Sequence, residues 1–461
     1  MRPTRWRRST HVLIGVAVLL VVAAVVGVAA FVSAPAPASQ PPPIKPEPKP
    51  AVAQPGVTPL ADSAPKPTPD RLAATLAPFV ADPNLGAFTG RVTDAASGTQ
   101  LWAQGPGVPM QPASTNKVLT TAAALLTLDR DARLTTTVLT DPDAPGLIIL
   151  RGGGDPTLSA APADQPTWYK GAARISDLVK QVRDAGVAVK SVQVDTSAYS
   201  GPTMAPGWDP VDMQNGDFAP MESVMLDGGR TQPVSVDSTR SPTPALDAGR
   251  ALAVALGVNP ATVTVVTTAS ATAKQVAAVQ SPPLIERLRQ LMNESDNVMA
   301  ESTGREVAGA LNRPESFDGA VQAVLGQLRS AGIDTTGATL FDSSGLSVND
   351  RLTALTLDGV VNAAAGDATP KLRPLLDVLP IAGGSGTLSN RYVDTDAGRA
   401  ALGFLRAKTG SLTGTNALAG IVTDASGRVL TFALLSNNAG PTGRTAIDAL
   451  AATLRSCGCG S

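Results

Sequence analysis

Two side chains that could act together chemically, Ser114 and Lys117, lie three residues apart at the predicted start of a helix. They belong to the stretch Pro112–Lys117, which leads into the almost uncharged stretch Val118–Leu126. Residues three apart on a helix share one face, so the hydroxyl and the amine point into the same space. An amine in an apolar first turn, near the positive end of the helix dipole, has its charged form disfavoured. A neutral lysine could then take the serine proton and make the serine an activated nucleophile.

A serine three residues before a lysine is a weak signal by itself. The same spacing occurs in Ser63–Lys66, inside a proline-rich tract that cannot be helical. In isolation, Ser114 is more often a helix cap beside a surface lysine. Other parts of the sequence must decide between these two interpretations.

Composition removes most alternative catalysts. The only histidine, His11, lies at the edge of an N-terminal apolar run, so a folded part beyond that run cannot use Ser-His-Asp, Cys-His or histidine–zinc chemistry. Cys457 and Cys459 lie in a glycine-rich tail, where a catalytic thiol would be poorly placed, and their pairing stays open. The net charge is −1 with 16% charged residues, which argues against a nucleic-acid partner. A serine with a lysine base is among the few options left for a hydrolase.

A second polar group, Ser295-Asp296-Asn297, follows a predicted helix over Pro282–Asn293. On an extended loop, a hydroxyl and an amide two residues apart point to the same side. Ser295 could relay protons there while Asn297 holds a substrate amide. Taken singly, the group is more often an ordinary turn or cap.

A third group, Lys408-Thr409-Gly410-Ser411, precedes the last predicted hairpin. A cation and two hydroxyls on an edge strand would suit a substrate carboxylate. Gly410 would let the backbone of a ligand approach closely. The alternative for Lys408 alone is an exposed strand lysine.

The elements that must position these groups come from both ends of the chain. Predicted strands flank turns at residues 94–98 and 423–428, a buried helix follows the first hairpin, and a closing helix covers about 444–454. This pattern predicts one sheet assembled from the two termini. We expect residues 70–130 and 281–456 to form that domain and residues 131–280, a long mixed region, to be inserted into it. Within the insertion, Trp208 and Phe218 could line a substrate pocket, but core or lid packing is favoured.

The N-terminal part predicts a membrane anchor and a spacer. Four arginines precede the apolar run 12–32, which is long enough to span a bilayer, and none follows soon after. We expect residues 1–11 in the cytoplasm and the remainder outside, unless the segment is a cleaved signal sequence. Prolines recur over 33–69, which favours an extended spacer. Residues 457–461 form a short Cys-Gly-Cys tail.

In the order Ser-x-x-Lys, Ser-Asp-Asn, Lys-Thr-Gly, the three groups resemble the motifs of penicillin-binding proteins and class A β-lactamases. Further stretches resemble class C low-molecular-mass penicillin-binding proteins, which carry a large insertion between the first two motifs. The resemblance covers roughly residues 70–456. The stretches are Gly152–Leu158, Ser295–Glu301, Asp342–Ser347, Leu379–Gly383, Gly386–Leu388 and Arg406–Gly410.

The resemblance implies an α/β (α+β) penicillin-binding protein/β-lactamase-like transpeptidase fold, with an antiparallel sheet, flanking helices and a large inserted domain. It implies that Ser114 is the nucleophile and Lys117 the general base, and that Ser295 passes a proton onward with the help of Lys408. The implied substrate-binding residues are Asn297, Thr409, Gly410 and Ser411. No metal and no organic cofactor are implied.

The family consists of serine D-alanyl-D-alanine carboxypeptidases and endopeptidases. The expected substrates are therefore peptidoglycan stem peptides ending in D-Ala-D-Ala, and β-lactam antibiotics are expected as covalent inhibitors. Carboxypeptidase action is the first expectation and DD-endopeptidase action the second. A β-lactamase and a catalytically silent cell-wall-binding scaffold are the remaining alternatives.

Overall fold

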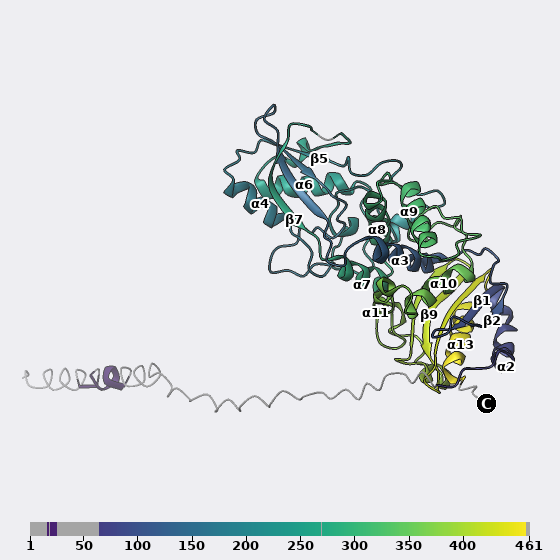
Figure 1. Ribbon diagram of the computed structural model, residues 1–461. Coiled ribbons are helices and arrows are strands. Elements are labelled where there is room, and N and C mark those ends of the chain that lie inside the picture. Colours follow the sequence, from purple (N-terminus) through teal and green to yellow (C-terminus); the bar gives the residue numbers. More distant parts are fainter. Residues whose placement is uncertain (1–15, 18, 25–63, 269, 458–461) are drawn as a thin grey trace, which may run out of the picture. The chain divides into compact units, whose positions relative to one another are not determined.

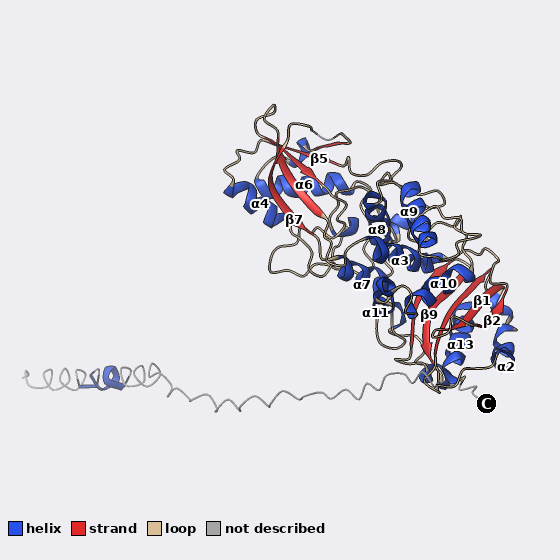
Figure 2. Ribbon diagram, in the orientation of Figure 1, coloured by secondary structure: helices blue, strands red, loops and turns tan. Residues whose placement is uncertain are grey.

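Strands from both ends of the folded chain pair in one five-stranded antiparallel sheet, in the order β2-β1-β10-β9-β8 (Figure 2). Strand β1 pairs with β10 along its whole length, from Ala87 opposite Asn437 to Asp94 opposite Leu430. The prediction of a sheet assembled from the two termini is confirmed. The strands are β1 (Ala87–Asp94), β2 (Gln100–Gln104), β8 (Leu405–Leu412), β9 (Thr415–Thr423) and β10 (Val429–Asn437).

This structure, a computed structural model, describes residues 16–17, 19–24, 64–268 and 270–457. Most of the predicted anchor and spacer lies outside these residues. Within the described part of the chain, no helix combines the length and the apolarity needed to cross a bilayer. Cys457 is buried and disulfide-bonded, and the rest of the predicted tail lies outside the residues that the structure describes.

Helices cover both faces of this sheet (Figure 1). Alternate residues of a strand face opposite sides, so Ala417 and Ala419 of β9 pack in one apolar cluster while Leu418 packs in another. The first cluster holds helix α10 (Ala354–Ala365), and the second holds α2 (Pro69–Val80) and α13 (Gly443–Ser456). The small alanines let the helices of the first cluster approach the sheet closely.

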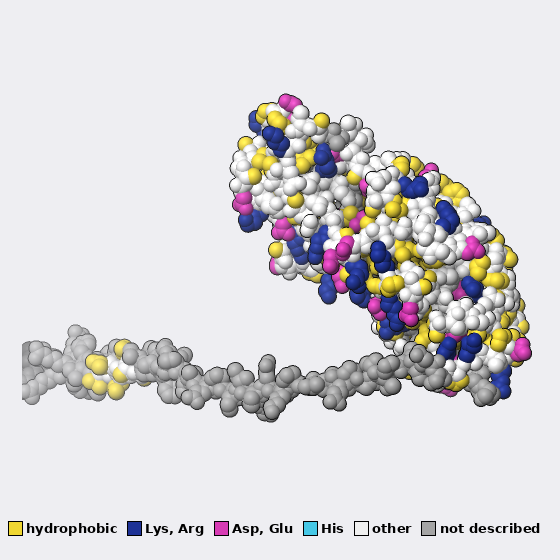
Figure 3. Space-filling model, in the orientation of Figure 1, with side chains coloured by type: hydrophobic (Ala, Val, Ile, Leu, Met, Phe, Trp, Pro, Cys, Tyr) yellow, Lys and Arg dark blue, Asp and Glu magenta, His cyan; other side chains and the backbone are white. Residues whose placement is uncertain are grey.

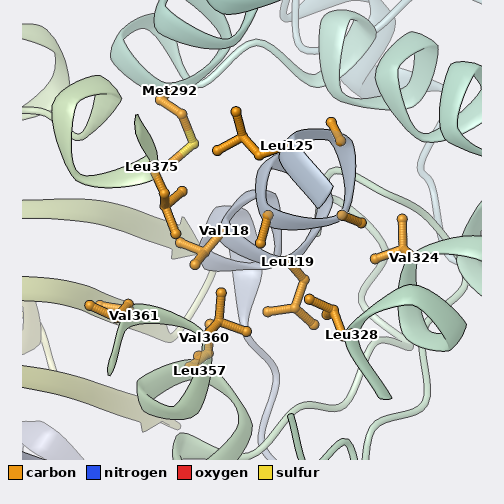
Figure 4. Close-up of a cluster of buried hydrophobic side chains, with 14 of the residues drawn as sticks. Val118, Leu119, Leu125, Met292, Val324, Leu328, Leu357, Val360, Val361 and Leu375 are labelled. Atoms are coloured by element: carbon orange, nitrogen blue, oxygen red, sulfur yellow. The ribbon is translucent and has the colours of Figure 1, made fainter. Parts of the chain in front are cut away.

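Helix α3 (Lys117–Thr127) lies in the middle of the first cluster, against α8 (Asn297–Ala310), α9 (Phe317–Ser330) and α10. Every residue of α3 from its start to Leu125 is buried. A helix that is apolar on all sides gains stability only when it is surrounded by protein. Figure 4 shows its side chains Val118, Leu119 and Leu125 among those of neighbouring helices. The helix that begins beside the Ser114 motif is therefore rigidly held.

The residues predicted as the insertion contain a second five-stranded sheet, ordered β6-β5-β4-β3-β7. β4, β5 and β6 are parallel to one another, whereas β3 pairs antiparallel with β4 and β7. The sequence did not predict β7, because six of its seven residues are exposed or half-buried and show no clear alternation. The elements are β3 (Thr135–Thr140), β4 (Leu147–Arg151), β5 (Ser191–Asp195), β6 (Thr264–Val266) and β7 (Lys274–Gln280), with helices α4 (Ile175–Asp184) and α6 (Pro244–Leu256) sharing an apolar cluster with the sheet.

Short elements join these parts. Further α-helices are α5 (Val211–Gln214), α7 (Leu284–Glu294), α11 (Pro374–Val378) and α12 (Asp396–Ala400). The 3₁₀ helices are η1 (Pro83–Leu85), η2 (Ala113–Asn116), η3 (Asp227–Gly229), η4 (Pro260–Thr262), η5 (Pro370–Leu372) and η6 (Gly386–Leu388). On the face shown in Figure 3, basic and acidic side chains are interspersed.

Candidate active site

Ser114 lies in the 3₁₀ turn η2, and this turn directly precedes α3. The prediction that Ser114 belongs to the first turn of the α-helix is wrong, because a short 3₁₀ helix precedes α3 and contains this serine. Two glycines pack against the turn: a side chain on Gly345 would meet the carbonyl oxygen of Ala113 at 1.9 Å, and one on Gly410 would meet that of Pro112 at 2.7 Å. Ala113 itself has a positive φ of 48°, which an alanine seldom adopts. Close packing therefore holds the serine in place.

Lys117 is fully buried, and its Nζ donates to three oxygens. The distances are 2.9 Å to Ser114 Oγ, 2.6 Å to Asn297 Oδ1 and 2.8 Å to the carbonyl oxygen of Ser344. Burial lowers the pKa of Lys117 to about 8, although nearby carboxylates, Asp342 first among them, oppose the shift. The interpretation of Lys117 as a surface lysine is therefore wrong.

The hydrogen-bond partners of Lys117 determine the direction in which its amine can accept a proton. A neutral amine has two N–H bonds and one lone pair, and carbonyl oxygens can only accept hydrogen bonds. If Asn297 and Ser344 take the two N–H bonds, the lone pair is left facing the hydroxyl of Ser114. Asn297 is itself oriented, because its Nδ2 donates to the carbonyl oxygen of Asp217 at 2.9 Å. The neutral lysine can then accept the proton of Ser114.

Ser295-Asp296-Asn297 forms a tight junction between two helices, not the extended loop that we predicted. Ser295 ends α7 in the left-handed conformation, with φ 56°, and Asn297 is the first residue of α8. Asp296 caps α8 through Met299 N at 2.9 Å and accepts from the hydroxyl of Tyr169 at 2.7 Å. The junction still directs Ser295 and Asn297 toward the two lysines, because each of their side chains bonds one of them.

Lys408 lies on β8, the edge strand of the main sheet. Its Nζ donates to Ser295 Oγ at 2.9 Å and to the carbonyl oxygen of Thr409 at 2.7 Å. Burial, together with the positive charges of Lys117 and Arg391, lowers the pKa of Lys408 well below its ordinary range. Lys408 is fully buried, so the alternative of an exposed strand lysine is wrong. A second amine–hydroxyl pair thus lies beside the first.

The hydroxyls of these pairs open onto one cavity of about 680 Å³. Of the eight predicted site residues, five line it, while both lysines lie buried behind their serines and Gly410 backs the Ser114 turn. The five are Ser114, Ser295, Asn297, Thr409 and Ser411. Three acidic residues and two arginines complete the charged lining: Asp212, Asp217, Glu294, Arg391 and Arg444.

Sequence reasoning gave no role to several residues that the structure brings to this site. Ser344 supplies an acceptor to Lys117, and Thr387 accepts a hydrogen bond from Thr409 Oγ1 at 2.9 Å. Both belong to stretches, Asp342–Ser347 and Gly386–Leu388, that stood out in the sequence only as family signatures. Trp208 and Phe218 are buried and pack against each other with tilted rings, so packing is confirmed as their structural role.

The fold and the two serine–lysine pairs define a serine peptidase of the penicillin-recognising class. The chain belongs to the D-Ala-D-Ala carboxypeptidase 3 (S13) family, whose profile matches residues 72–241 and 231–456. A profile described as the N-terminal domain of Carboxypeptidase Rv3627c-like proteins matches residues 1–59.

Two relatives match along the whole chain and a third along most of it. Carboxypeptidase DacB of Mycolicibacterium smegmatis is 72% identical, and the match covers 100% of both chains. Carboxypeptidase Rv3627c of Mycobacterium tuberculosis is 60% identical, again over 100% of both chains. The D-alanyl-D-alanine carboxypeptidase of an Actinomadura species is 31% identical over 81% of this chain and 82% of its own.

Among solved structures, penicillin binding protein 4 (dacB) from Haemophilus influenzae has the same fold. It superposes with a TM-score of 0.67 at 23% identity, covering 84% of this chain and 98% of that one. The same protein complexed with a novel β-lactam superposes with a TM-score of 0.63 at 21% identity, covering 82% and 98%.

Proposed function

We propose that this serine peptidase removes the terminal D-alanine from peptidoglycan stem peptides through an acyl-enzyme on Ser114. The observation that carries the proposal is the buried amine of Lys117, aimed at Ser114 Oγ by two carbonyl acceptors. The family membership and the 72% identity to a carboxypeptidase support the reaction class.

In the acylation step, Lys117 Nζ takes the Ser114 proton while Oγ attacks the carbonyl carbon between the two D-alanines. Backbone N–H groups of Ser114 and Ser411 are proposed to hold the oxyanion, a role in which losing one donor slows comparable hydrolases about 10²–10³-fold. As the C–N bond breaks, the leaving nitrogen receives a proton through Ser295, and the proton that Lys117 took from Ser114 replaces it by way of the Ser295–Lys408 pair, so that Lys117 is neutral again. Water then hydrolyses the ester: Lys117 takes a proton from the attacking water and returns it to Ser114 Oγ as the acyl group leaves.

The substrate would be held by residues that line the cavity. Ser411 offers its hydroxyl to the terminal carboxylate, Thr409 can do the same when its O–H turns from Thr387 to the substrate, and Lys408 behind them adds positive potential. Asn297 has two N–H donors on its amide, and Asp217 O takes only one of them. The second remains for a carbonyl oxygen of the acyl chain.

Labelling with a fluorescent penicillin tests this proposal on the full chain in detergent. The parent should carry a stable adduct and release D-alanine from a D-Ala-D-Ala muropeptide, and a Ser114→Ala variant should do neither. Rapid turnover of a chromogenic cephalosporin would instead support a β-lactamase. A folded parent that binds peptidoglycan but never acylates would support a scaffold.

Cross-linked and uncross-linked muropeptides distinguish the two peptidase activities. A carboxypeptidase releases free D-alanine from the uncross-linked peptide, whereas a DD-endopeptidase converts cross-linked dimers to monomers. We propose the carboxypeptidase reaction as the main one.

We also propose that the folded part lies outside the cytoplasmic membrane, tethered through residues 12–32. The apolar run and the arginines before it support this orientation. Where the described chain begins, the carbonyl oxygen of Pro65 accepts from Ser426 Oγ at 3.2 Å, so the proposed spacer meets the folded part at the β9–β10 turn. Protease accessibility in spheroplasts, beside an intact-membrane control, tests the orientation.

A further inference from the structure

A segment of the insertion returns from the second sheet to the active site. This segment, Ala205–Phe218, is called the brace below. It contacts the loop Asp342–Asn349, whose residue Ser344 supplies an acceptor to Lys117. Ser347 Oγ donates to the carbonyl oxygen of Pro206 at 2.7 Å, and the backbone of Gly207 lies so close that a side chain there would meet Ser347 Oγ at 2.7 Å.

Trp208 is the anchor of the brace. Its indole is only 7% exposed and packs against Phe218, with ring centroids 4.4 Å apart, and edge-on against Phe317 at 5.3 Å. Its Nε1 donates to Asp342 Oδ2 at 2.8 Å. Two aromatic neighbours fix the direction of this N–H group, so the indole holds the Asp342 carboxylate in one orientation.

Asp342 in turn shapes the loop that faces Lys117. Its Oδ1 accepts from the backbone of Ser344 at 3.1 Å and of Gly345 at 2.6 Å, and its Oδ2 accepts from the backbone of Ser347 at 2.7 Å. These bonds curl the loop around the carboxylate. The carbonyl oxygen of Ser344 is thereby presented to Lys117 Nζ at 2.8 Å.

The other end of the brace reaches the second acceptor of Lys117. The carbonyl oxygen of Asp217 accepts from Asn297 Nδ2, which leaves Asn297 Oδ1 directed at Lys117. The brace therefore supports both carbonyl acceptors of Lys117. It bonds Asn297 directly through the carbonyl oxygen of Asp217, and it holds Ser344 indirectly through the loop Asp342–Asn349.

We propose that Trp208 is a positioning residue for the reaction, acting through Asp342 and Ser344 to aim Lys117 at Ser114. The inference rests on the proposed function, since it concerns the amine that activates the serine. The insertion then contributes to catalysis indirectly, because it braces the acceptors without itself touching the reacting atoms.

The test is a Trp208→Phe variant of the full chain, which keeps an aromatic ring against Phe218 and Phe317 but removes the N–H donor. Penicillin acylation kinetics separate the initial binding constant from the acylation rate constant. We expect the rate constant to fall about tenfold, as losing a hydrogen bond to a charged group would produce. We expect the binding constant to change less than about twofold. A matched Trp102→Phe variant on β2, away from the cavity, should leave both constants unchanged.

Two further variants keep the inference falsifiable. Ser347→Ala removes the hydroxyl that donates to the carbonyl oxygen of Pro206 and accepts from the backbone of Asn349, so it should lower the acylation rate in the same way even if Trp208→Phe folds poorly. In an Asp342→Ala background, adding Trp208→Phe should cause no further loss if the indole acts through that carboxylate.

The outcomes separate the two proposals. A parent that is never acylated overturns the proposed function. A parent that is acylated, with Trp208→Phe and Ser347→Ala both folded and equal to it in acylation rate, overturns the positioning role alone. Strictly additive losses in the double variant would also overturn it, because they would place Trp208 on a separate path.

Discussion

Lys408 Nζ donates to Ser295 Oγ across 2.9 Å, joining the edge strand β8 to the junction between α7 and α8. The separation matches that between Lys117 Nζ and Ser114 Oγ. Two buried amines therefore lie beside one cavity, and each is hydrogen-bonded to a serine hydroxyl. The charge of Lys117 is among the causes that lower the pKa of Lys408. Because the two lysines influence each other's pKa, one of them can carry a proton while the other stays neutral.

The first prediction concerns the base. A Lys117→Met variant should lose acylation by about 10³-fold or more, because Lys117 is the one titratable group that bonds Ser114 Oγ among the residues that the structure describes. It should fold normally, since a buried amine is replaced by an apolar chain of similar length. Labelling rates and melting temperatures, measured on the same samples, check both statements. Acylation at the parental rate would remove Lys117 from the base role.

The second prediction concerns the relay. Ser295→Ala should slow D-alanine release by about 10²–10³-fold, within the range for loss of a proton-transferring group. The matched control is Ser330→Ala at the exposed end of α9, outside the lining of the cavity, which should behave as the parent. A Ser295→Ala enzyme with full peptidase activity would show that Lys408 protonates the leaving group without it.

The third prediction concerns pH. Lys117 must be neutral to accept a proton, and burial lowers its pKa to about 8. Acylation at subsaturating penicillin should therefore rise with pH and level off above about pH 9, with a midpoint near that pKa. Stopped-flow acylation between pH 6 and 10 checks this, with circular dichroism confirming the fold at each pH. A rate that falls over this interval would contradict the assignment.

The fourth prediction follows from the same shift and concerns stability. The folded state loses the Lys117 proton near pH 8, whereas the unfolded chain keeps it to about its ordinary value of 10.5. Between these values the unfolded state binds more protons, so this group makes the free energy of unfolding increase with pH. The slope is about 1.4 kcal/mol per pH unit for one group at most. Lys117→Met should lack this contribution when denaturant unfolding of both proteins is compared at pH 8 and 10.

The fifth prediction concerns packing behind the nucleophile. Gly410→Ala would place a methyl group 2.7 Å from the carbonyl oxygen of Pro112 and 3.1 Å from the nitrogen of Thr115. The Ser114 turn must move, so we expect acylation to fall about tenfold or more. Gly326→Ala on α9, whose new methyl group would meet only Arg329 at 4.0 Å, should be tolerated or slightly stabilising. Equal acylation by both variants would contradict the packing argument.

Much of the fold could be read from local patterns. Alternating strands at the two ends of the chain predicted the main sheet, and the uncharged stretch after Lys117 predicted a buried helix. Local patterns failed where neighbours override them: Ser295 is left-handed because a helix must end and another begin within two residues. β7 was missed because only its pairing with β3 makes it a strand.

The sequence by itself determined which side chains are available. With one histidine, at position 11, and three motifs in a diagnostic order, it pointed to serine–lysine chemistry without a structure. Only the tertiary structure decided which hydroxyl each lysine serves and which acceptors aim it. Lys117 meets Asn297 and Ser344 at separations of 180 and 227 residues along the chain. Such contacts depend on how α3 packs against α8 and the Asp342–Asn349 loop, and no local propensity encodes that packing.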